Sequence, residues 1–471
     1  MRRPLARDEV TPSPVAYVSD GAALLQTLFD LIDAAQECVV LQMYLLAGNH
    51  ELVLLHPRAG AFPWAAALTD RLIAKRQRDP HVELVVILDT QTPDDARRTR
   101  GGRGPLSRHR LEAAGVSVLN ANLFSTHFDR DRRFPAATRF HTKPTAETPV
   151  DEWVAAQQAW QTWHNVEDHR KNLVIDRGTF GAITSHNAID LAFDWHDNLF
   201  LVGAPVAGQL WDECRLALQQ ALELPQRVDQ PTRDRLTALA ALPPTPQPAS
   251  TWAPSAADDT LTALGDARAR PALVPAVATL VSSRGIRTEL EAAVDACKAG
   301  DVVCAASTYF ADTRLFGKLW AAAERGAQVR VLIDDCAGLP LPAFESWFVR
   351  TFVNLRCTEL ARRRAVGGFE LRVFSSKGPG PMMHLKTVGF LGARTFLIGG
   401  QANYTPNTFS GAWLDTVVKV EGEPVVQAFL GQFESLWRLA LPHQAPSVFE
   451  RLRNTVLLTL LRLAEWIGFR P

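Results

Sequence analysis

The 471-residue chain lacks several features that would place it in a specialised class of proteins. Its 50 Lys and Arg are balanced by 50 Asp and Glu, so no global field favours a nucleic-acid partner. No uncharged apolar run reaches the roughly 18 residues of a membrane-spanning helix. The segment 1–9 has no signal-peptide core, and none of the six cysteines forms a Cys-x-x-Cys pair. We therefore expect reduced, mostly buried cysteines and a cytoplasmic protein.

What the chain does contain is a histidine and a lysine two residues apart, twice, each at the start of an apolar stretch. His169 and Lys171 open the first stretch, and His384 and Lys386 open the second. Because side chains alternate along a β-strand, residues two apart share a face. Each pair should therefore place an imidazole beside a fixed cation.

The same companions follow each pair in the same order. Asn187 follows the first pair at nearly the spacing at which Asn403 follows the second. A Trp-x-Asp sequence comes next in each half and ends in Asp197 and Asp415. Such fixed-order similarity indicates a duplicated structural unit.

The elements around these motifs also repeat, as apolar strands that alternate with helical stretches. This alternation predicts α/β halves with largely parallel sheets. The expected strands are 38–44, 82–89 and 115–119 in the first half, and 302–309, 329–334 and 368–374 in the second. We predict a first half over 1–225, a Pro/Ala-rich linker over 226–275, a second half over 276–450 and an amphipathic C-terminal helix over 451–471.

The pattern His-x-Lys-x4-Asp, followed by a small-residue turn and an Asn, resembles the signature of the phospholipase D superfamily. The first copy matches through Asp176, whereas the second has Leu391 in place of the motif Asp. The resemblance implies two tandem phospholipase D-like α/β halves, packed face to face as a pseudo-symmetric pair with a shared central cleft. We expect the motif Asp to brace the end of a strand, so that its loss leaves a working site.

The resemblance further implies a covalent phosphohistidine. His169, whose motif is complete, is interpreted as the nucleophile, and His384 as the general acid, although the reverse assignment is open. Lys171 and Lys386 would neutralise the phosphate oxygens, and the site list is completed by Asn187 and Asn403 as hydrogen-bond donors and by Asp197 and Asp415 as orienting carboxylates. Asp415 is expected to orient the acid. No cofactor or metal is predicted.

Two other patterns are weighed against this interpretation. His141 and Lys143 are followed by Pro144, with no apolar strand, and are interpreted as a loop. His164 and His169 could belong to a zinc site with His186 and His196 nearby, but a spacing of five divides the first two between opposite sides of a helix. We therefore place the metal-free chemistry first.

Similarity to phospholipase D, phosphatidylserine synthase and cardiolipin synthase implies a phospholipid substrate, with water or an alcohol as acceptor. Basic clusters favour contact with an anionic membrane; they comprise Arg97, Arg98, Arg100, Arg103, Arg108 and Arg110, and Arg362 to Arg364. The C-terminal helix could lie in a membrane interface or pack on the body. A nucleic-acid phosphodiesterase and a degenerate, non-catalytic membrane-binding module remain the alternatives. The sequence predicts no oligomeric state.

Overall fold

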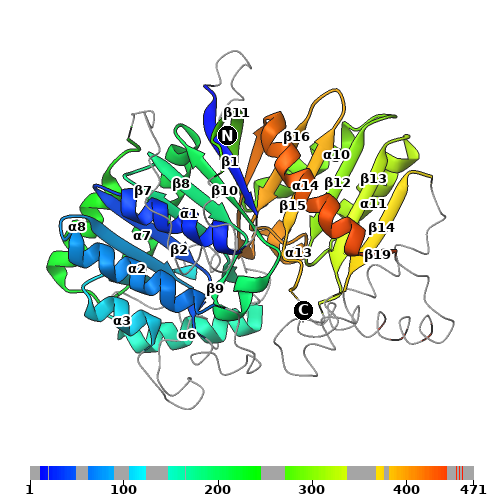
Figure 1. The fold of residues 1–471 in the computed structure, drawn as a ribbon. Helices are drawn as coiled ribbons and strands as arrows, with labels where there is room; N and C mark the ends of the chain where they lie inside the picture. The colour runs from blue at the N-terminus through cyan, green and yellow to red at the C-terminus, as the bar shows by residue number, and fades with distance from the viewer. Residues whose placement is uncertain are drawn as a thin grey trace.

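The computed structural model describes residues 11–19, 21–48, 62–89, 106–123, 147–164, 166–245, 271–336, 367–375 and 381–442, together with Leu452, Val456 and Thr459. Within these ranges the fold is mixed α/β, with two similar halves side by side (Figure 1). No helix of the described part is long and apolar enough to cross a membrane.

The first half is built around seven strands of one large sheet. Its main elements are β1 (Ser13–Ser19), α1 (Gly21–Ala34), β2 (Cys38–Met43), β3 (Leu46–Ala47), α2 (Trp64–Arg78), β4 (Glu83–Leu88), α3 (Ser107–Ala113), β5 (Ser117–Asn120), α6 (Val150–His164), β6 (Glu167–Asp168), β7 (Lys171–Ile175), β8 (Phe180–Thr184), β9 (Ala188–Ile189), η4 (Asp190–Asp194), β10 (Asn198–Gly203), α7 (Val206–Leu222) and α8 (Gln230–Ala241).

The second half repeats this arrangement. It contains β11 (Val274–Ser282), α10 (Arg284–Asp295), β12 (Val302–Ser307), α11 (Thr313–Glu324), β13 (Gln328–Asp334), β14 (Phe369–Phe374), β15 (Lys386–Leu391), β16 (Phe396–Gly400), α13 (Pro406–Ser410), β17 (Trp413–Leu414), β18 (Thr416–Glu421), α14 (Glu423–Leu439) and β19 (Leu441–Pro442).

Strand order shows the duplication directly. The first half runs β5-β4-β2-β7-β8-β10-β1, and the second runs β14-β13-β12-β15-β16-β18-β11 in the same sense. The halves join where β1 pairs antiparallel with β11, near the centre of Figure 1, which makes one 15-stranded sheet with β19 on its outer edge. The predicted pair of similar α/β halves is confirmed.

The expectation of largely parallel sheets is wrong. Only β2, β4 and β5, and their counterparts β12, β13 and β14, run parallel among the strands of the large sheet. β7 and β8 pair antiparallel because the short turn 176–179 joins them, and a turn of that length cannot connect parallel strands. β15 and β16 are joined in the same way.

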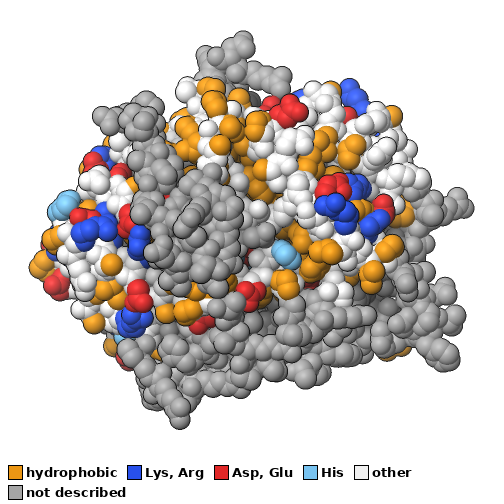
Figure 2. Space-filling view, in the orientation of Figure 1, with side chains coloured by type: hydrophobic (Ala, Val, Ile, Leu, Met, Phe, Trp, Pro, Cys, Tyr) orange, Lys and Arg blue, Asp and Glu red, His pale blue; other side chains and the backbone are white. Residues whose placement is uncertain are grey.

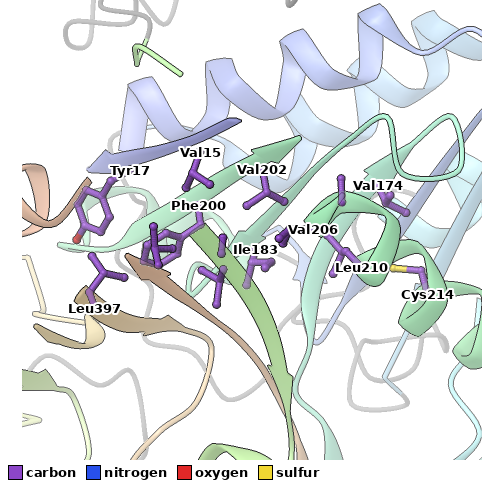
Figure 3. Close-up of a cluster of buried hydrophobic side chains, with 14 of the residues drawn as sticks. Val15, Tyr17, Val174, Ile183, Phe200, Val202, Val206, Leu210, Cys214 and Leu397 are labelled. Atoms are coloured by element: carbon purple, nitrogen blue, oxygen red, sulfur yellow. The ribbon is translucent and has the colours of Figure 1, made fainter. Parts of the chain in front are cut away.

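The two halves also share a hydrophobic core. Figure 3 shows Leu397 of β16 beside Tyr17 and Phe200 of the first half, and all three belong to one buried cluster. The Phe200 ring packs on the backbone at Gly399, where an added Cβ would lie 2.9 Å from it. The sheet faces of the two halves therefore pack on each other, as the resemblance implies.

Helix α8 forms inside the stretch that was expected to be a linker. Asp229 caps it by accepting the Thr232 N–H at 2.9 Å, and Leu236 is fully buried. Gln219 of α7 donates to the Ala240 carbonyl at 3.1 Å, so α8 belongs to the core of the first half. Residues 246–270 of the predicted linker lie outside the described residues. In the predicted C-terminal helix only Leu452, Val456 and Thr459 are described, and all three are helical and exposed.

Asp176 braces the start of β2. Its carboxylate accepts the N–H groups of Gln36, Glu37 and Cys38 at distances of 3.0, 2.7 and 3.1 Å. These bonds confirm the bracing role expected for the motif Asp.

In the second half, where Leu391 replaces the motif Asp, different contacts are made at this position. Leu391 packs against the shared core, and Asp301, just before β12, accepts the Lys298 N–H at 2.8 Å. In place of a carboxylate from the end of β15, the turn before β12 is therefore braced by an aspartate of its own.

Candidate active site

Both His-x-Lys segments lie where the two halves meet, beyond the carboxyl ends of the parallel strands, the usual place for a site in an α/β fold. Strand β17, which precedes Asp415, pairs with β6, which precedes His169. In the mirrored arrangement, a bridge joins His196 to Met383. The Trp-x-Asp sequence of each half thus runs beside the His-x-Lys sequence of the other half.

The histidines and aspartates consequently pair crosswise. His169 Nδ1 lies 2.8 Å from Oδ1 of Asp415, and His384 Nδ1 lies 2.8 Å from Oδ2 of Asp197. All four side chains are buried. The expectation that Asp415 orients His384 is therefore wrong: the strand pairing places Asp415 on His169, and Asp197 on His384.

Each orienting carboxylate has a second hydrogen-bond donor from its own half. Ser185 donates to Asp197, and Thr408 donates to Asp415 Oδ2 at 3.2 Å. Ser185 stands in the small-residue turn of the motif, which is a usable sequence signal. No pattern in the sequence points to Thr408.

Two further aspartate side chains hold the backbone of the His-x-Lys segments. Asp89 Oδ2 accepts the N–H of Asp168, and Asp334 Oδ2 accepts the N–H of Met383, both at 2.8 Å. The two donors are the residues directly before His169 and His384. Each of these aspartates ends the second predicted strand of its half. The sequence did not predict their contact with the His-x-Lys segments.

Burial and neighbouring cations keep both imidazoles neutral. Burial, and then the Lys171 charge, lowers the pKa of His169 to about 4, although Asp415 opposes the shift. Burial and the charges of Lys386 and Lys171 hold the pKa of His384 well below its ordinary value. At neutral pH both rings can therefore offer an unprotonated Nε2 when no ligand is bound.

The two lysines are buried and lie differently. Lys171 Nζ donates to the His169 carbonyl at 2.7 Å, whereas Lys386 Nζ lies 2.9 Å from His384 Nε2. Burial lowers the pKa of Lys171 to about 8 and that of Lys386 to about 7. A bound anion would favour the charged form of both, so the pair suits a phosphate group.

Both predicted asparagines are buried, and each has a side-chain oxygen without a hydrogen-bond partner in the described part of the chain. Asn187 and Asn403 are 7% and 2% exposed, and within the described part of the chain neither Oδ1 has a hydrogen-bond partner. Buried polar groups are almost always satisfied in native proteins. Two orphaned amide oxygens at equivalent places in the repeat therefore point to a ligand group that can donate a hydrogen bond.

Aromatic rings line the histidines. Trp413 lies 5.3 Å from His169, and Trp195 lies 4.9 Å from His384, measured between ring centroids. Tyr44 packs on His169 at 4.8 Å, and its hydroxyl hydrogen-bonds Glu167. Burial raises the pKa of Glu167 to about 8, so its carboxyl is largely protonated at neutral pH.

No group of three or more His, Cys, Asp or Glu side chains suited to a metal ion occurs among the described residues. His186 Nδ1 contacts the Asn187 carbonyl at 2.9 Å, and the His196 ring lies edge-on to Phe374. The His164 side chain, and the segment with His141 and Lys143, lie outside the described residues.

Comparisons with known proteins agree with the sequence resemblance. Residues 295–437 match the family described as cardiolipin synthase, PLD-like domain. The fold of 98% of the chain is similar to the crystal structure of phosphatidylserine synthase from Haemophilus influenzae Rd KW20, with a TM-score of 0.58, 11% identity and 97% of that chain covered.

A shorter match is to Nuc, a phospholipase D family member from Salmonella typhimurium. It covers 36% of this chain and 99% of Nuc at 16% identity, with a TM-score of 0.27 that is too low to add weight. No curated protein matches the sequence.

Proposed function

Because the chain belongs to the phospholipase D superfamily, we propose that it cleaves phospholipid phosphodiesters through a covalent phosphohistidine, with water or an alcohol as the final acceptor. The observation that carries the proposal is the crosswise pairing of His169 with Asp415 and of His384 with Asp197. It supplies two oriented imidazoles in a buried site that also holds Lys171 and Lys386.

In the first step, His169 Nε2 attacks phosphorus while the bond to the leaving oxygen breaks. His384 Nε2 gives its proton to that oxygen, which departs as a neutral alcohol. Asp415 stabilises the positive charge that forms on the His169 ring, as a carboxylate on the far nitrogen does in other imidazole catalysts.

In the second step, His384 Nε2 takes a proton from water or an alcohol, whose oxygen attacks phosphorus. The phosphorus–nitrogen bond breaks, and His169 returns to its neutral form. Water gives hydrolysis, and an alcohol gives phosphatidyl transfer. Lys171 and Lys386 would hold the non-bridging oxygens in both steps, with the side-chain N–H groups of Asn187 and Asn403 as further donors.

The first step needs a protonated His384, yet its pKa is low without a ligand. Part of that depression comes from the charges of Lys386 and Lys171. An anionic phosphodiester between the lysines offsets those charges, so its binding raises the pKa of His384 towards the range a general acid needs.

The surface charge supports a lipid rather than a nucleic acid as substrate. On the face in Figure 2, the visible Lys and Arg side chains are interspersed with Asp and Glu. Of the predicted basic clusters, Arg108 is buried against Glu112 and Asn120, and Arg110 pairs with Asp70. The other arginines of these clusters lie outside the described residues.

Contact with a membrane surface is part of the proposal. Leu439 and Leu441 are 68% and 60% exposed at the end of α14, and the exposed Leu452 and Val456 follow in the chain. Full-length protein should co-sediment with anionic liposomes, and deletion of residues 454–471 should weaken this without loss of soluble phosphodiesterase activity. Unchanged co-sedimentation would assign the tail to packing on the body.

The activity test uses purified protein, mixed phospholipids and a short alcohol, with lipid products measured by mass spectrometry. We expect phosphatidic acid or a phosphatidyl alcohol from the wild type, and none from His169→Ala or His384→Ala. His81→Ala, at an exposed position, is the matched control. The double variant should be little worse than either single variant, since residues that act as a unit are not additive. Additive losses, or DNA cleaved in place of lipid, would overturn the proposal.

A further inference from the structure

Strand register shows which residues of the two halves are equivalent. Met43 lies opposite Lys171 in the β2–β7 pair, and Ser307 lies opposite Lys386 in the β12–β15 pair. The residues that follow, Tyr44 and Thr308, are therefore equivalent.

The neighbouring strands give the same result. Met43 lies opposite Leu88, and Ser307 lies opposite Ile333; an aspartate follows in each case. The predicted strands 38–44 and 302–309 end in Tyr44 and Tyr309, which would make these two tyrosines equivalent; the register shows that this match is wrong by one residue.

Tyr44 fills one side of the first histidine. Its ring packs on His169 at 4.8 Å, and Lys171 Nζ lies 5.2 Å from the same ring. Trp413 lies 5.3 Å from the same histidine, so two aromatic rings pack on His169.

Thr308 provides no such ring beside His384. Trp195 is the one aromatic ring found against His384 in the described part of the structure. The Thr308 N–H donates to the Leu385 carbonyl at 3.2 Å, so Thr308 lies against the chain between His384 and Lys386. By the strand register, the second half therefore has a small side chain at the position that Tyr44 holds in the first half.

Thr308 also carries an orphaned polar atom. It is wholly buried, and its hydroxyl has no hydrogen-bond partner among the described residues. A buried hydroxyl without a partner is costly, which points to a ligand group that completes it. Asn403 Oδ1, from the same half, is orphaned in the same way.

The residue two positions before each histidine is also polar in the first half and apolar in the second. Glu167, bonded to Tyr44, precedes His169, whereas Met382, in an apolar cluster with Trp195 and Ile189, precedes His384. The surroundings of the two histidines are therefore chemically distinct, and the two steps of the reaction can be assigned to different sides.

We propose that Thr308 forms the alcohol subsite beside His384, where its hydroxyl hydrogen-bonds the alcohol that leaves in the first step and the water or alcohol that enters in the second. This inference rests on the proposed function. It makes His384 the proton donor and acceptor for the alcohol, and His169, enclosed by Tyr44 and Trp413, the residue that carries the phosphatidyl group.

The test compares transfer with hydrolysis in the same assay, with ethanol or glycerol as acceptor. Thr308→Tyr restores a ring at this place and should lower the ratio of transfer to hydrolysis at least 100-fold. Thr308→Val, which removes only the hydroxyl, should lower the ratio about tenfold and raise KM for the alcohol, and Thr308→Ser should recover it. Thr237→Val, on the exposed side of α8, is the control.

The outcomes separate the two proposals. Equal losses of transfer and hydrolysis in Thr308→Val, or a KM change for the lipid in place of the alcohol, overturn the subsite alone. No turnover by the wild type overturns the proposed function and the subsite with it.

Discussion

His169 Nδ1, in the first half of the chain, lies 2.8 Å from Oδ1 of Asp415, in the second half. The reciprocal pair, His384 and Asp197, has the same 2.8 Å separation. Each of the two histidines is therefore oriented by a carboxylate from the other half, and both contacts depend on the pairing of the halves. The shared core and the β1–β11 pairing stabilise the arrangement on which this depends.

Under the proposed mechanism, the crosswise pairing gives the two aspartates different steps. Asp415→Asn should slow formation of the covalent intermediate, because it no longer stabilises charge on His169. Asp197→Asn should slow protonation of the leaving group by His384. Each loss should be roughly 10²- to 10⁴-fold in kcat, the range seen when an orienting carboxylate is lost.

A phosphodiester with a p-nitrophenol leaving group separates the two roles, since that group departs without an acid. Single-turnover rates should be restored in Asp197→Asn and remain low in Asp415→Asn. Equal rescue of both variants would show that the step assignment is wrong.

Asp89 and Asp334 should act through the backbone that carries the histidines. Removal of the carboxylate in Asp334→Ala leaves the Met383 N–H without its acceptor, at a cost of roughly 1–3 kcal/mol. If this free energy is lost from the catalytic placement of His384, kcat should drop about 5- to 150-fold. KM should change less than threefold.

Asp334→Asn keeps an acceptor oxygen and should recover most of kcat, and Asp295→Ala, at an exposed position, is the control. Urea unfolding measures stability in parallel. A loss of stability with unchanged kcat would assign Asp334 a purely structural role.

The pKa values of the free site predict an unusual pH profile. Nε2 of His169 should stay unprotonated until the pH falls towards 4, so kcat/KM should have no acid limb near 6.5. Lys386, with a pKa of about 7, loses its charge as the pH rises through that value. Attraction for an anionic substrate then weakens, and His384, unprotonated in the free site, must gain a proton before the first step. Both effects make kcat/KM fall as the pH rises, most steeply above pH 7.

Lys386→Arg keeps the positive charge at high pH and should move this alkaline limb upwards, if the variant turns over. A profile that is flat from pH 7 to 9 with an acid limb near 6.5 would contradict the assigned protonation states.

Asp176 and Leu391 occupy equivalent positions, but substitutions at the two positions should have different effects on stability and rate. Asp176→Leu removes the acceptor of three N–H groups at the start of β2, so it should lower stability by roughly 1–3 kcal/mol with little effect on the rate at permissive temperature. Leu391→Asp should leave turnover within about tenfold, since tenfold corresponds to roughly 1.36 kcal/mol of barrier.

Thermal unfolding and one activity assay on both variants provide the measurement. An increase in turnover of several orders of magnitude in Leu391→Asp would mean that the second half is a decayed site.

Much of the site could be predicted from the sequence because the repeated order of His, Lys, Asn and Asp survives without any knowledge of contacts. The crosswise pairing could not, since spacing within one half does not say whether Asp415 meets the histidine of its own half or that of the other. The equivalence of Tyr44 and Thr308 could not be predicted from the sequence either. It depends on the register of β2 with β7 and of β12 with β15, and the nearby Tyr309 offered a false match.

The same limit explains the error about the sheet. Alternating strands and helices suggest parallel pairing, but the direction of β7 and β8 is set by the short turn between them. Asp176, Arg177 and Gly178 have positive φ in that turn, which the motif alone does not reveal.

The most direct test of the central claim is to trap the phosphohistidine. In His384→Ala, a p-nitrophenyl phosphodiester can still react with His169, but water is no longer activated for the second step. Intact-protein mass spectrometry should show one added phosphoryl ester, and peptide mapping should place it on His169. Absence of the adduct under these conditions, or its location on any other residue, would contradict the account.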